Sequence, residues 1–553
     1  MVDFWPRHAE LLKSAVDAAS KRIYWSPYPE IPSPSAYGET AKADGEAEFK
    51  ALLGKPFELG QPGKSRVGKE ISPFGLELNV SYEAAPVDEV ILASSKAANA
   101  WADADVEARV GVCAEILQRL NKKSFLIANA VMHTSGQAFP MAFQAGGPHA
   151  QDRGLEALAY AYAEMTRVPS EVRWEKPQGK NEPLRLDKTF RVVARGIGLV
   201  IGCATFPTWN SYPGLFASLA TGNSVIVKPH PAAILPLAIT VRIAREVLTE
   251  AGYDPNVVML AADELDSPVT KALATHPEVA IIDYTGSSTF GAWIRREAAG
   301  KLVYTEEAGV NSIVVDSSPK FKAMCDNIAF SISLYSGQMC TAPQNIYVPA
   351  DGIETDEGPK SFDDVASGIA AAVDKLLSDP VRAAGVLGAI QSDATLERIG
   401  DARKLGKVVR DSSPVPGPNG APSRTMTPII LAVDAKDEQA YLAERFGPIA
   451  FIIKAATRGD SISRAAKSAK QHGAITAAIY TTDDAKLQEA EKAFAQAAVS
   501  LSVNLIGGIF VNQSAAFSDF HVTGGNPAGN ASLTDTAFVA NRFRVVAVRR
   551  LAA

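Results

Sequence analysis

Cys340 is the side chain in this sequence with the clearest setting for nucleophilic chemistry. It lies in the stretch Ser336 to Pro343 (SGQMCTAP), after an apolar helical run and before a short β-type run, Asn345 to Val348. The sequence therefore predicts a turn between a helix and a strand, which Gly337 allows to bend tightly. A thiolate is a strong nucleophile near neutral pH, whereas a lone cysteine is more often a small buried hydrophobe, so the neighbouring residues must decide.

Two adjacent carboxylates, Glu306 and Glu307, are candidates for a general base. They lie between two strand-like runs, and Glu306 precedes Cys340 by 34 residues (340 − 306). On an extended segment successive side chains point to opposite sides, so only one of the two can face the thiol. The alternative is an acidic turn that is simply solvated. The spacing places Glu306 first and leaves Glu307 open.

A third stretch, Cys203 to Asn210 (CATFPTWN), closes a very apolar strand. In order and approximate spacing, the three stretches together resemble the aldehyde dehydrogenase superfamily. That resemblance implies that Cys340 is the nucleophile, that one of the two glutamates is the general base, and that Asn210 binds the oxyanion. The E-x-G-G register of the family, aligned on Gly309, points to Glu307 as the base.

The same resemblance implies a nicotinamide cofactor. Thr285-Gly286-Ser287 opens a helix, where unpaired N–H groups favour a phosphate, and it matches a pyrophosphate-binding turn of the family. Lys228 ends a strand where relatives contact the adenosine ribose. Glu444 to Pro448 (ERFGP) matches the motif whose carboxylate holds the nicotinamide ribose. The residues expected to bind the cofactor are Phe206, Pro207, Trp209, Lys228, His230, Pro231, Gly286, Ser287, Glu444 and Phe446.

Pro231 stands where NAD-preferring relatives often carry a glutamate that binds the ribose 2′-hydroxyl. A carboxylate would repel a 2′-phosphate and proline cannot, while His230 and Lys228 would add positive potential. We therefore predict a preference for NADP, with NAD as the alternative. No metal is required by this chemistry, and the four scattered cysteines show neither a zinc motif nor a disulfide framework.

Composition narrows the class of protein. The chain has 553 residues, 47% of them hydrophobic and 21% charged, which predicts a globular protein of two to four domains. A net charge of −6 disfavours nucleic acid as a partner. The N-terminus lacks a signal peptide core, and the longest apolar run, about 196–206, is too short to span a bilayer. These features, with a free thiol, predict a cytoplasmic protein.

Strands and helices alternate from about residue 198 to 299, which predicts a parallel, doubly wound sheet. The expected fold is α/β, like that of the aldehyde dehydrogenases, with two doubly wound domains and a small oligomerisation arm. The expected parts are an N-terminal extension (1–75), a dinucleotide-binding domain (76–310) with residues 172–190 in the arm, a catalytic domain (311–515), and a C-terminal loop and strand (516–553). The resemblance implies a homodimer or homotetramer.

Three finer expectations concern elements. The helix after the CATFPTWN stretch is expected over 212–221, residues 411–427 are expected as a surface loop or hairpin, and strands at 475–480 and 509–512 are expected to close the catalytic sheet. The loop over 517–530 departs from the usual pattern of the family.

The expected reaction is oxidation of an aldehyde or semialdehyde to the free acid. A carboxylate near the thiol indicates water as the acyl acceptor, because relatives that acylate coenzyme A usually lack one. Within the superfamily the sequence most resembles the phenylacetic-acid degradation enzymes, which implies a semialdehyde substrate, either free or linked to coenzyme A. The alternatives are an enzyme that acylates coenzyme A, a non-catalytic protein on this fold, and a cysteine hydrolase, which is disfavoured because no histidine is close to Cys340 in sequence, although a distant one could fold close.

Overall fold

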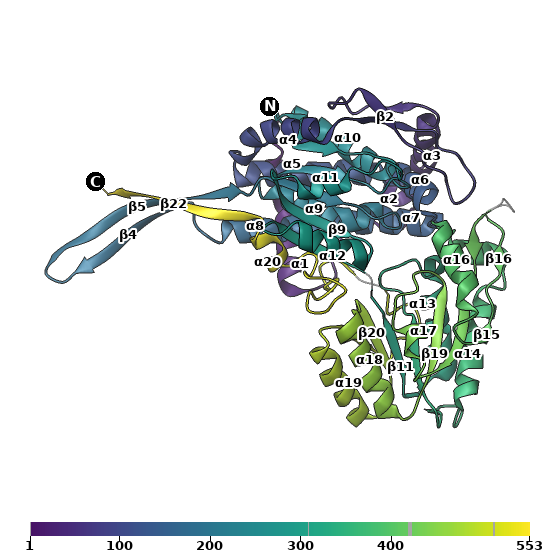
Figure 1. Cartoon of the computed structure of the whole chain (residues 1–553). Helices are drawn as coiled ribbons and strands as arrows, with labels where there is room; N and C mark the ends of the chain where they lie inside the picture. Colours follow the sequence, from purple (N-terminus) through teal and green to yellow (C-terminus); the bar gives the residue numbers. More distant parts are fainter. Residues whose placement is uncertain (1, 308, 418–422, 513–514, 553) are drawn as a thin grey trace.

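The computed structural model describes residues 2–307, 309–417, 423–512 and 515–552. Two α/β domains lie side by side, and a long β arm extends away from them (Figure 1). Each domain is built on a mostly parallel sheet, which confirms the expected fold class. Among the described helices, none is both long and apolar enough to cross a membrane.

The first sheet has five parallel strands in the order β10-β9-β6-β7-β8. β6 and β7 are buried along their whole lengths, as expected for strands that helices cover on both faces. Its strands are β6 (Ile197–Ile201), β7 (Ser224–Lys228), β8 (Val258–Leu260), β9 (Val279–Thr285) and β10 (Leu302–Glu306). Helix α9 (Pro207–Ala220) starts five residues before the expected 212. Proline suits the first turn of a helix, so Trp209 and Asn210 lie in that turn rather than in a loop.

The N-terminal segment packs into this first domain. Helix α1 (Trp5–Lys21) buries Leu12, Ala15 and Ala18 in the same core cluster as helices α5 (Val106–Lys122) and α8 (Pro148–Thr166). The approach is close: a Cβ on Gly111 of α5 would lie 2.6 Å from the backbone nitrogen of Trp5. The helical part also includes α4 (Val87–Ala102), α6 (Ser124–Ser135), α7 (Phe139–Gly146) and, after β7, α10 (Leu235–Glu250).

The second sheet has seven strands in the order β15-β18-β19-β13-β11-β20-β21, and β15 is the antiparallel one. They are β11 (Ser312–Val315), β13 (Asn345–Pro349), β15 (Lys407–Arg410), β18 (Ile429–Asp434), β19 (Ile449–Ala455), β20 (Thr476–Tyr480) and β21 (Ser500–Val503). The strand expected at 509–512 is wrong, because β21 takes the edge. The run 509–512 follows two glycines, and the carbonyl of Asn512 instead accepts a hydrogen bond from the Thr341 hydroxyl beside Cys340.

The hairpin expected within 411–427 is present as the short pair β16 (Pro414–Val415) and β17 (Thr425–Met426), although residues 418–422 lie outside the described chain. Helix α14 (Phe362–Leu376) covers one face of the sheet. Its capping box at Ser361 and Asp364 explains why it begins where it does.

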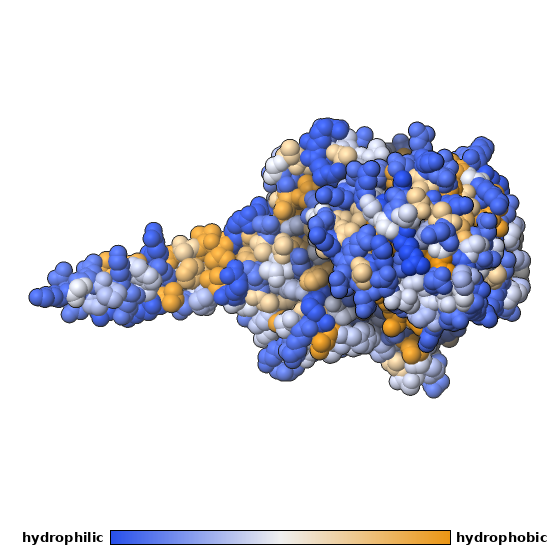
Figure 2. Space-filling view, turned by 90° about the horizontal axis from the view of Figure 1, so that it is seen from below, coloured by the Kyte–Doolittle hydropathy of each residue, from blue (hydrophilic) through white to orange (hydrophobic). Residues whose placement is uncertain are grey.

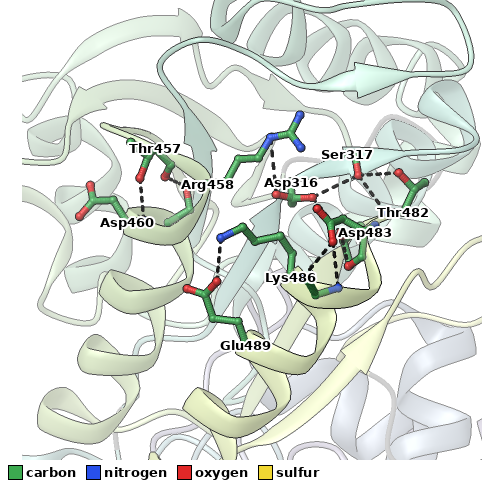
Figure 3. A network of polar contacts seen from close by, with 12 residues as sticks. Asp316, Ser317, Thr457, Arg458, Asp460, Thr482, Asp483, Lys486 and Glu489 are labelled. Carbon is green, nitrogen blue, oxygen red and sulfur yellow. Dashed lines mark hydrogen bonds and ion pairs between the residues drawn. The ribbon is translucent and has the colours of Figure 1, made fainter.

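A polar network occupies the carboxyl edge of the second sheet (Figure 3). Asp316, fully buried after β11, accepts hydrogen bonds from the hydroxyls of Thr481 (2.8 Å) and Ser317 (3.2 Å), and the Arg458 guanidinium lies 3.7 Å away. Thr457 and Asp483 cap helices α18 (Arg458–His472) and α19 (Asp484–Gln496) at the same edge. This edge, which often binds ligands in doubly wound sheets, is filled by the protein's own side chains.

Asp316→Ala is expected to lower the free energy of unfolding by about 1–3 kcal/mol, because it leaves buried hydroxyls without their acceptor. The comparison variant is Glu489→Gln, at the exposed end of the network, where it pairs with Lys486. That change is expected to cost less than about 1 kcal/mol. Urea unfolding of both variants checks the prediction, and equal losses would show that Asp316 is not the centre of the network.

The arm is a three-stranded antiparallel sheet in the order β22-β5-β4. It joins β4 (Glu171–Gln178) and β5 (Asn181–Ala194) to the C-terminal strand β22 (Phe543–Leu551). Residues 172–190, which were expected in the arm, lie in β4 and β5, and residues 186–194 of β5 pair with the final strand β22. Figure 2 shows apolar side chains gathered on the part of this arm nearer the body, with a hydrophilic tip. The exposed apolar residues of its strands include Val172, Trp174, Leu184, Val193, Val545, Val546, Val548 and Leu551.

Candidate active site

Cys340 lies in the predicted turn between helix α13 (Phe321–Ser333) and strand β13. The chain leaves α13 through Tyr335, Ser336 and Gly337, all with positive φ, and a Cβ on Gly337 would lie 2.4 Å from the Gly447 carbonyl oxygen. Such a run is costly for Tyr335 and Ser336, so the surrounding packing must hold it. Gly337 therefore allows the tight bend, as its residue type predicted.

Asn311, just before β11, fixes the position of this turn. Its side-chain amide donates hydrogen bonds to the carbonyl oxygens of Cys340 (2.8 Å) and Ala342 (2.9 Å). The thiol therefore sits at the amino ends of β11 and β13. Glu306 ends β10 and β11 is the next strand of the chain, so the site lies where the carboxyl edge of the first sheet meets the amino edge of the second.

The structure separates the two candidate glutamates. Glu306 is 1% exposed, and its carboxylate lies within 4.8 Å of the Cys340 sulfur. Glu307 points the other way, where it forms an ion pair with Arg295 and packs against Gly291. The geometry thus places Glu306, and not Glu307, beside the thiol.

Asn210 is brought to the same place by the first turn of α9. Its side-chain amide donates to Glu306 Oε2 at 3.0 Å, and its Oδ1 lies 3.6 Å from the Cys203 sulfur. Cys340, Glu306 and Asn210, which were predicted to act together, therefore form one cluster. In this structure the Asn210 donor is occupied by Glu306.

His521 was not among the predicted site residues. It comes from the divergent C-terminal loop, is 2% exposed, and its Nε2 lies 3.2 Å from Glu306 Oε1 and 3.9 Å from Cys340 Sγ. The cysteine hydrolase was disfavoured because no histidine is close to Cys340 in sequence. That argument fails, since His521, 181 positions away, folds against the thiol. Only the departure of this loop from the family pattern could have drawn attention to it.

Charge and burial set the protonation of these groups. Burial raises the pKa of Cys340 well above its usual value, and the neighbouring Glu306 carboxylate raises it further. Burial alone would raise the pKa of Glu306, but His521, the Cys340 thiol and Arg153 together hold it below the usual range. At neutral pH the resting pair is therefore a thiol beside a carboxylate, and the thiol needs a base before it can attack.

A cavity of about 550 Å³ opens onto the thiol. Phe206 and Trp209, which were expected to bind the cofactor, line this cavity together with Cys340 and His521, while Pro207 is buried where α9 begins. The N-terminal segment contributes Tyr24, Ser26 and Glu30, and further apolar lining comes from Met141, Phe330, Leu334, Val386 and Phe510. The cavity is mostly apolar, with polar groups on part of its wall.

Lys228 ends β7 as predicted, but its charge is already paired with a carboxylate. It is 2% exposed, and its Nζ lies 2.7 Å from Oδ1 of Asp263, which follows β8. Burial and the neighbouring Lys228 lower the pKa of His230 to about 4, so this imidazole is neutral at physiological pH. The expected positive potential around Pro231 is therefore wrong.

The remaining predicted cofactor residues fit a nucleotide. Gly286 and Ser287 precede helix α12 (Ser288–Glu297), and the Ser287 side chain caps it by accepting from the Phe290 N–H. Glu444 is mostly buried, and burial raises its pKa to about 7 even though the Gly309 N–H, at 3.4 Å, lowers it. A poorly satisfied buried carboxylate suits the hydroxyls of a ribose. Two residues after Glu444, the Phe446 carbonyl accepts a hydrogen bond from the Arg398 guanidinium.

Comparisons with known proteins agree with this geometry. Residues 78–525 match the Aldehyde dehydrogenase family. An N-succinylglutamate 5-semialdehyde dehydrogenase of Burkholderia orbicola is 27% identical over 394 residues, which cover 70% of this chain and 75% of that protein. The crystal structure of an NAD-dependent aldehyde dehydrogenase from Burkholderia multivorans is similar with a TM-score of 0.98 and 55% identity, covering 100% of this chain and 99% of that one.

A more distant structure shares the fold. The 1-pyrroline-5-carboxylate dehydrogenase from Thermus with bound NAD has a TM-score of 0.72 at 19% identity, covering 96% of this chain and 99% of that one. The family match covers well over half of the residues, including Cys340, Glu306, Asn210 and His521. From its sequence, its fold and the side chains gathered around one thiol, this chain belongs to the aldehyde dehydrogenase family.

Proposed function

We propose that the protein oxidises an aldehyde to the free carboxylic acid with NAD(P), through a thiohemiacetal and then a thioester on Cys340. The observation that carries the proposal is the Glu306 carboxylate held within 4.8 Å of a thiol on the wall of a cavity. A nucleophile that forms a thioester needs a second group to activate water, and this pair provides both.

Each residue of the cluster has a defined task in this proposal. Cys340 attacks the carbonyl carbon, and the Asn210 amide and the Cys340 backbone N–H receive the oxyanion. One such donor is worth roughly 3–4 kcal/mol. Bound NAD(P), held by Lys228, Glu444 and the start of α12, would supply the hydride acceptor. Glu306 then takes a proton from the water that hydrolyses the thioester.

A semialdehyde is the proposed substrate class. The support is the name of the Burkholderia orbicola relative and the resemblance of the SGQMCTAP stretch and the divergent loop to the phenylacetic-acid degradation enzymes. A substrate linked to coenzyme A, in the breakdown of phenylacetate or a related aromatic acid, is the finer form of this proposal.

Absorbance of reduced nicotinamide, recorded with NAD or NADP and a panel of aldehydes and semialdehydes, tests the reaction. We expect turnover without coenzyme A and the free acid as product. A product that forms only as an acyl-coenzyme A thioester would instead identify the acylating alternative. Ester hydrolysis without any nucleotide, combined with no aldehyde oxidation, would favour a cysteine hydrolase, which His521 makes chemically feasible.

The preference for NADP stays a prediction that depends on Pro231, and the charge of Asp263 acts against it. A 2′-phosphate near Lys228 would meet the buried carboxylate 2.7 Å from that ammonium. Asp263→Asn is therefore expected to raise the ratio of kcat/KM for NADP to that for NAD by about tenfold, equivalent to one charge interaction of about 1.4 kcal/mol. Saturation kinetics with both nucleotides measures the ratio, and an unchanged ratio would show that Asp263 does not face the ribose.

Assembly and location complete the proposal. We infer that the arm pairs with a second copy in a homodimer or homotetramer, since it exposes an apolar sheet away from the body of the molecule (Figure 2). Sedimentation equilibrium distinguishes these states. A cytoplasmic location stays a prediction from the free cysteines and the composition.

A further inference from the structure

His521 reaches the reacting thiol from the far end of the chain, and its placement is tightly determined. The Trp209 ring meets the imidazole edge-on, with 4.5 Å between centroids. The next residue, Val522, has φ +62°, in the left-handed region that a β-branched side chain rarely adopts. Val522 is nevertheless buried against Ile475 and Ala528, next to Cys340. A backbone held in a costly conformation at a reactive site is evidence that the placement matters.

We propose that His521 is a catalytic residue that accepts the thiol proton of Cys340 before the thiolate attacks the aldehyde. The proton passes from Sγ to Nε2, the S–H electron pair stays on sulfur and forms the new C–S bond, and the carbonyl π pair moves to oxygen. The imidazolium lies against the Glu306 carboxylate, whose Oε1 is 3.2 Å away. This inference rests on the proposed role of Cys340 as nucleophile.

Among the charged and titratable groups around the thiol, His521 is the one best suited to accept its proton. Glu306, from β10, accepts a hydrogen bond from Asn210 at Oε2, while its Oε1 lies 3.2 Å from the His521 Nε2, the nitrogen that must be free of a proton to accept one from the thiol. Cys203, after β6, and Glu444, after helix α17 (Glu438–Tyr441), both raise the pKa of the thiol. Arg153, from α8, helps to lower the pKa of Glu306 through its positive charge. Imidazole is the side chain suited to exchange a proton near neutral pH.

This assignment also separates the two bases of the reaction in time. With His521 holding the thiol proton, Glu306 remains a carboxylate through the attack. It is then available to take a proton from water in the hydrolytic step. A single glutamate that did both would have to release the first proton before it could accept the second.

The pH dependence of Cys340 alkylation by iodoacetamide tests the inference, because it needs neither aldehyde nor nucleotide. Mass spectrometry of the Cys340 peptide separates this reaction from that of Cys113, Cys203 and Cys325. His521→Gln keeps a hydrogen-bonding amide but cannot accept the proton. We expect alkylation at pH 7 to fall by about tenfold or more and the inflection of the profile to move up by at least one pH unit. His472→Gln, at the exposed end of α18, serves as the control and should keep the wild-type profile.

A wild-type profile in folded His521→Gln would overturn the inference. If that variant does not fold, the alkylation profile of the wild-type protein still decides. A rate at Cys340 that levels off by about pH 8 supports proton transfer to an imidazole, and a rate that still rises above pH 8 contradicts it. Failure of the proposed function is recognised separately, because turnover would then persist in Cys340→Ala.

Discussion

Cys340→Ala is expected to abolish aldehyde oxidation, with kcat reduced by at least about 10⁴-fold, because no other group in the cluster can form the covalent adduct. The fold should survive, since the turn is held by Asn311 and by the left-handed residues 335–337 rather than by the sulfur. Production of reduced nicotinamide, measured with the best aldehyde of the panel, checks the loss.

Cys325→Ala is the matched control for this variant. Cys325 is a buried thiol on α13, the helix that leads to the site, and it packs in the core of the second domain. Its replacement should lower stability slightly and leave kcat nearly unchanged. Oxidation that survives in Cys340→Ala would move the nucleophile elsewhere and remove the basis for the mechanism.

Glu306→Gln is expected to uncouple the two halves of the reaction. The thiol can still attack, so a burst of about one reduced nicotinamide per active site should remain. Steady-state turnover should then fall by roughly 10²–10⁴-fold, the usual contribution of a general base. Stopped-flow absorbance resolves the burst from the slow phase.

The neighbouring Glu307→Gln provides the comparison, because the two residues differ in direction rather than in chemistry. Glu307 pairs with Arg295 away from the thiol, so its replacement should leave kcat close to the wild-type value. Stability should fall by less than about 1 kcal/mol, because the Arg295 side chain is partly exposed and the glutamine amide still offers it an acceptor oxygen. If the kinetic defect appeared in Glu307→Gln and not in Glu306→Gln, the assignment of the base would be reversed.

Local patterns in the sequence were sufficient to predict much of the fold. The apolar strands of the first sheet, the Cys340 turn and the pairing of the arm with the final strand all follow from periodicity, turn residues and the family resemblance. Residues 509–512 were misread because a short apolar run after two glycines has the composition of a strand. Only tertiary contacts show that its carbonyl at Asn512 is used by Thr341.

The candidate site was predictable where residues are close in sequence and not where they meet only in space. The choice between Glu306 and Glu307 needed the direction of β10, which spacing suggests but cannot fix. Lys228 ends β7 and Asp263 follows β8, which pairs with β7, so their ion pair depends on strand order. His521 lies 181 residues from Cys340, and no periodicity relates the two.

Both ends of the chain line the cavity that opens onto Cys340. Tyr24 and Ser26 come from the N-terminal segment, and His521 follows the thiol by 181 residues. At roughly 5–20 residues per second, a ribosome needs about 10–35 s after inserting Cys340 before it inserts His521. A nascent chain therefore carries the thiol for many seconds without its proton acceptor. The site is therefore completed by folding and not by synthesis of the catalytic turn alone, because the thiol and its proton acceptor are neighbours only in space.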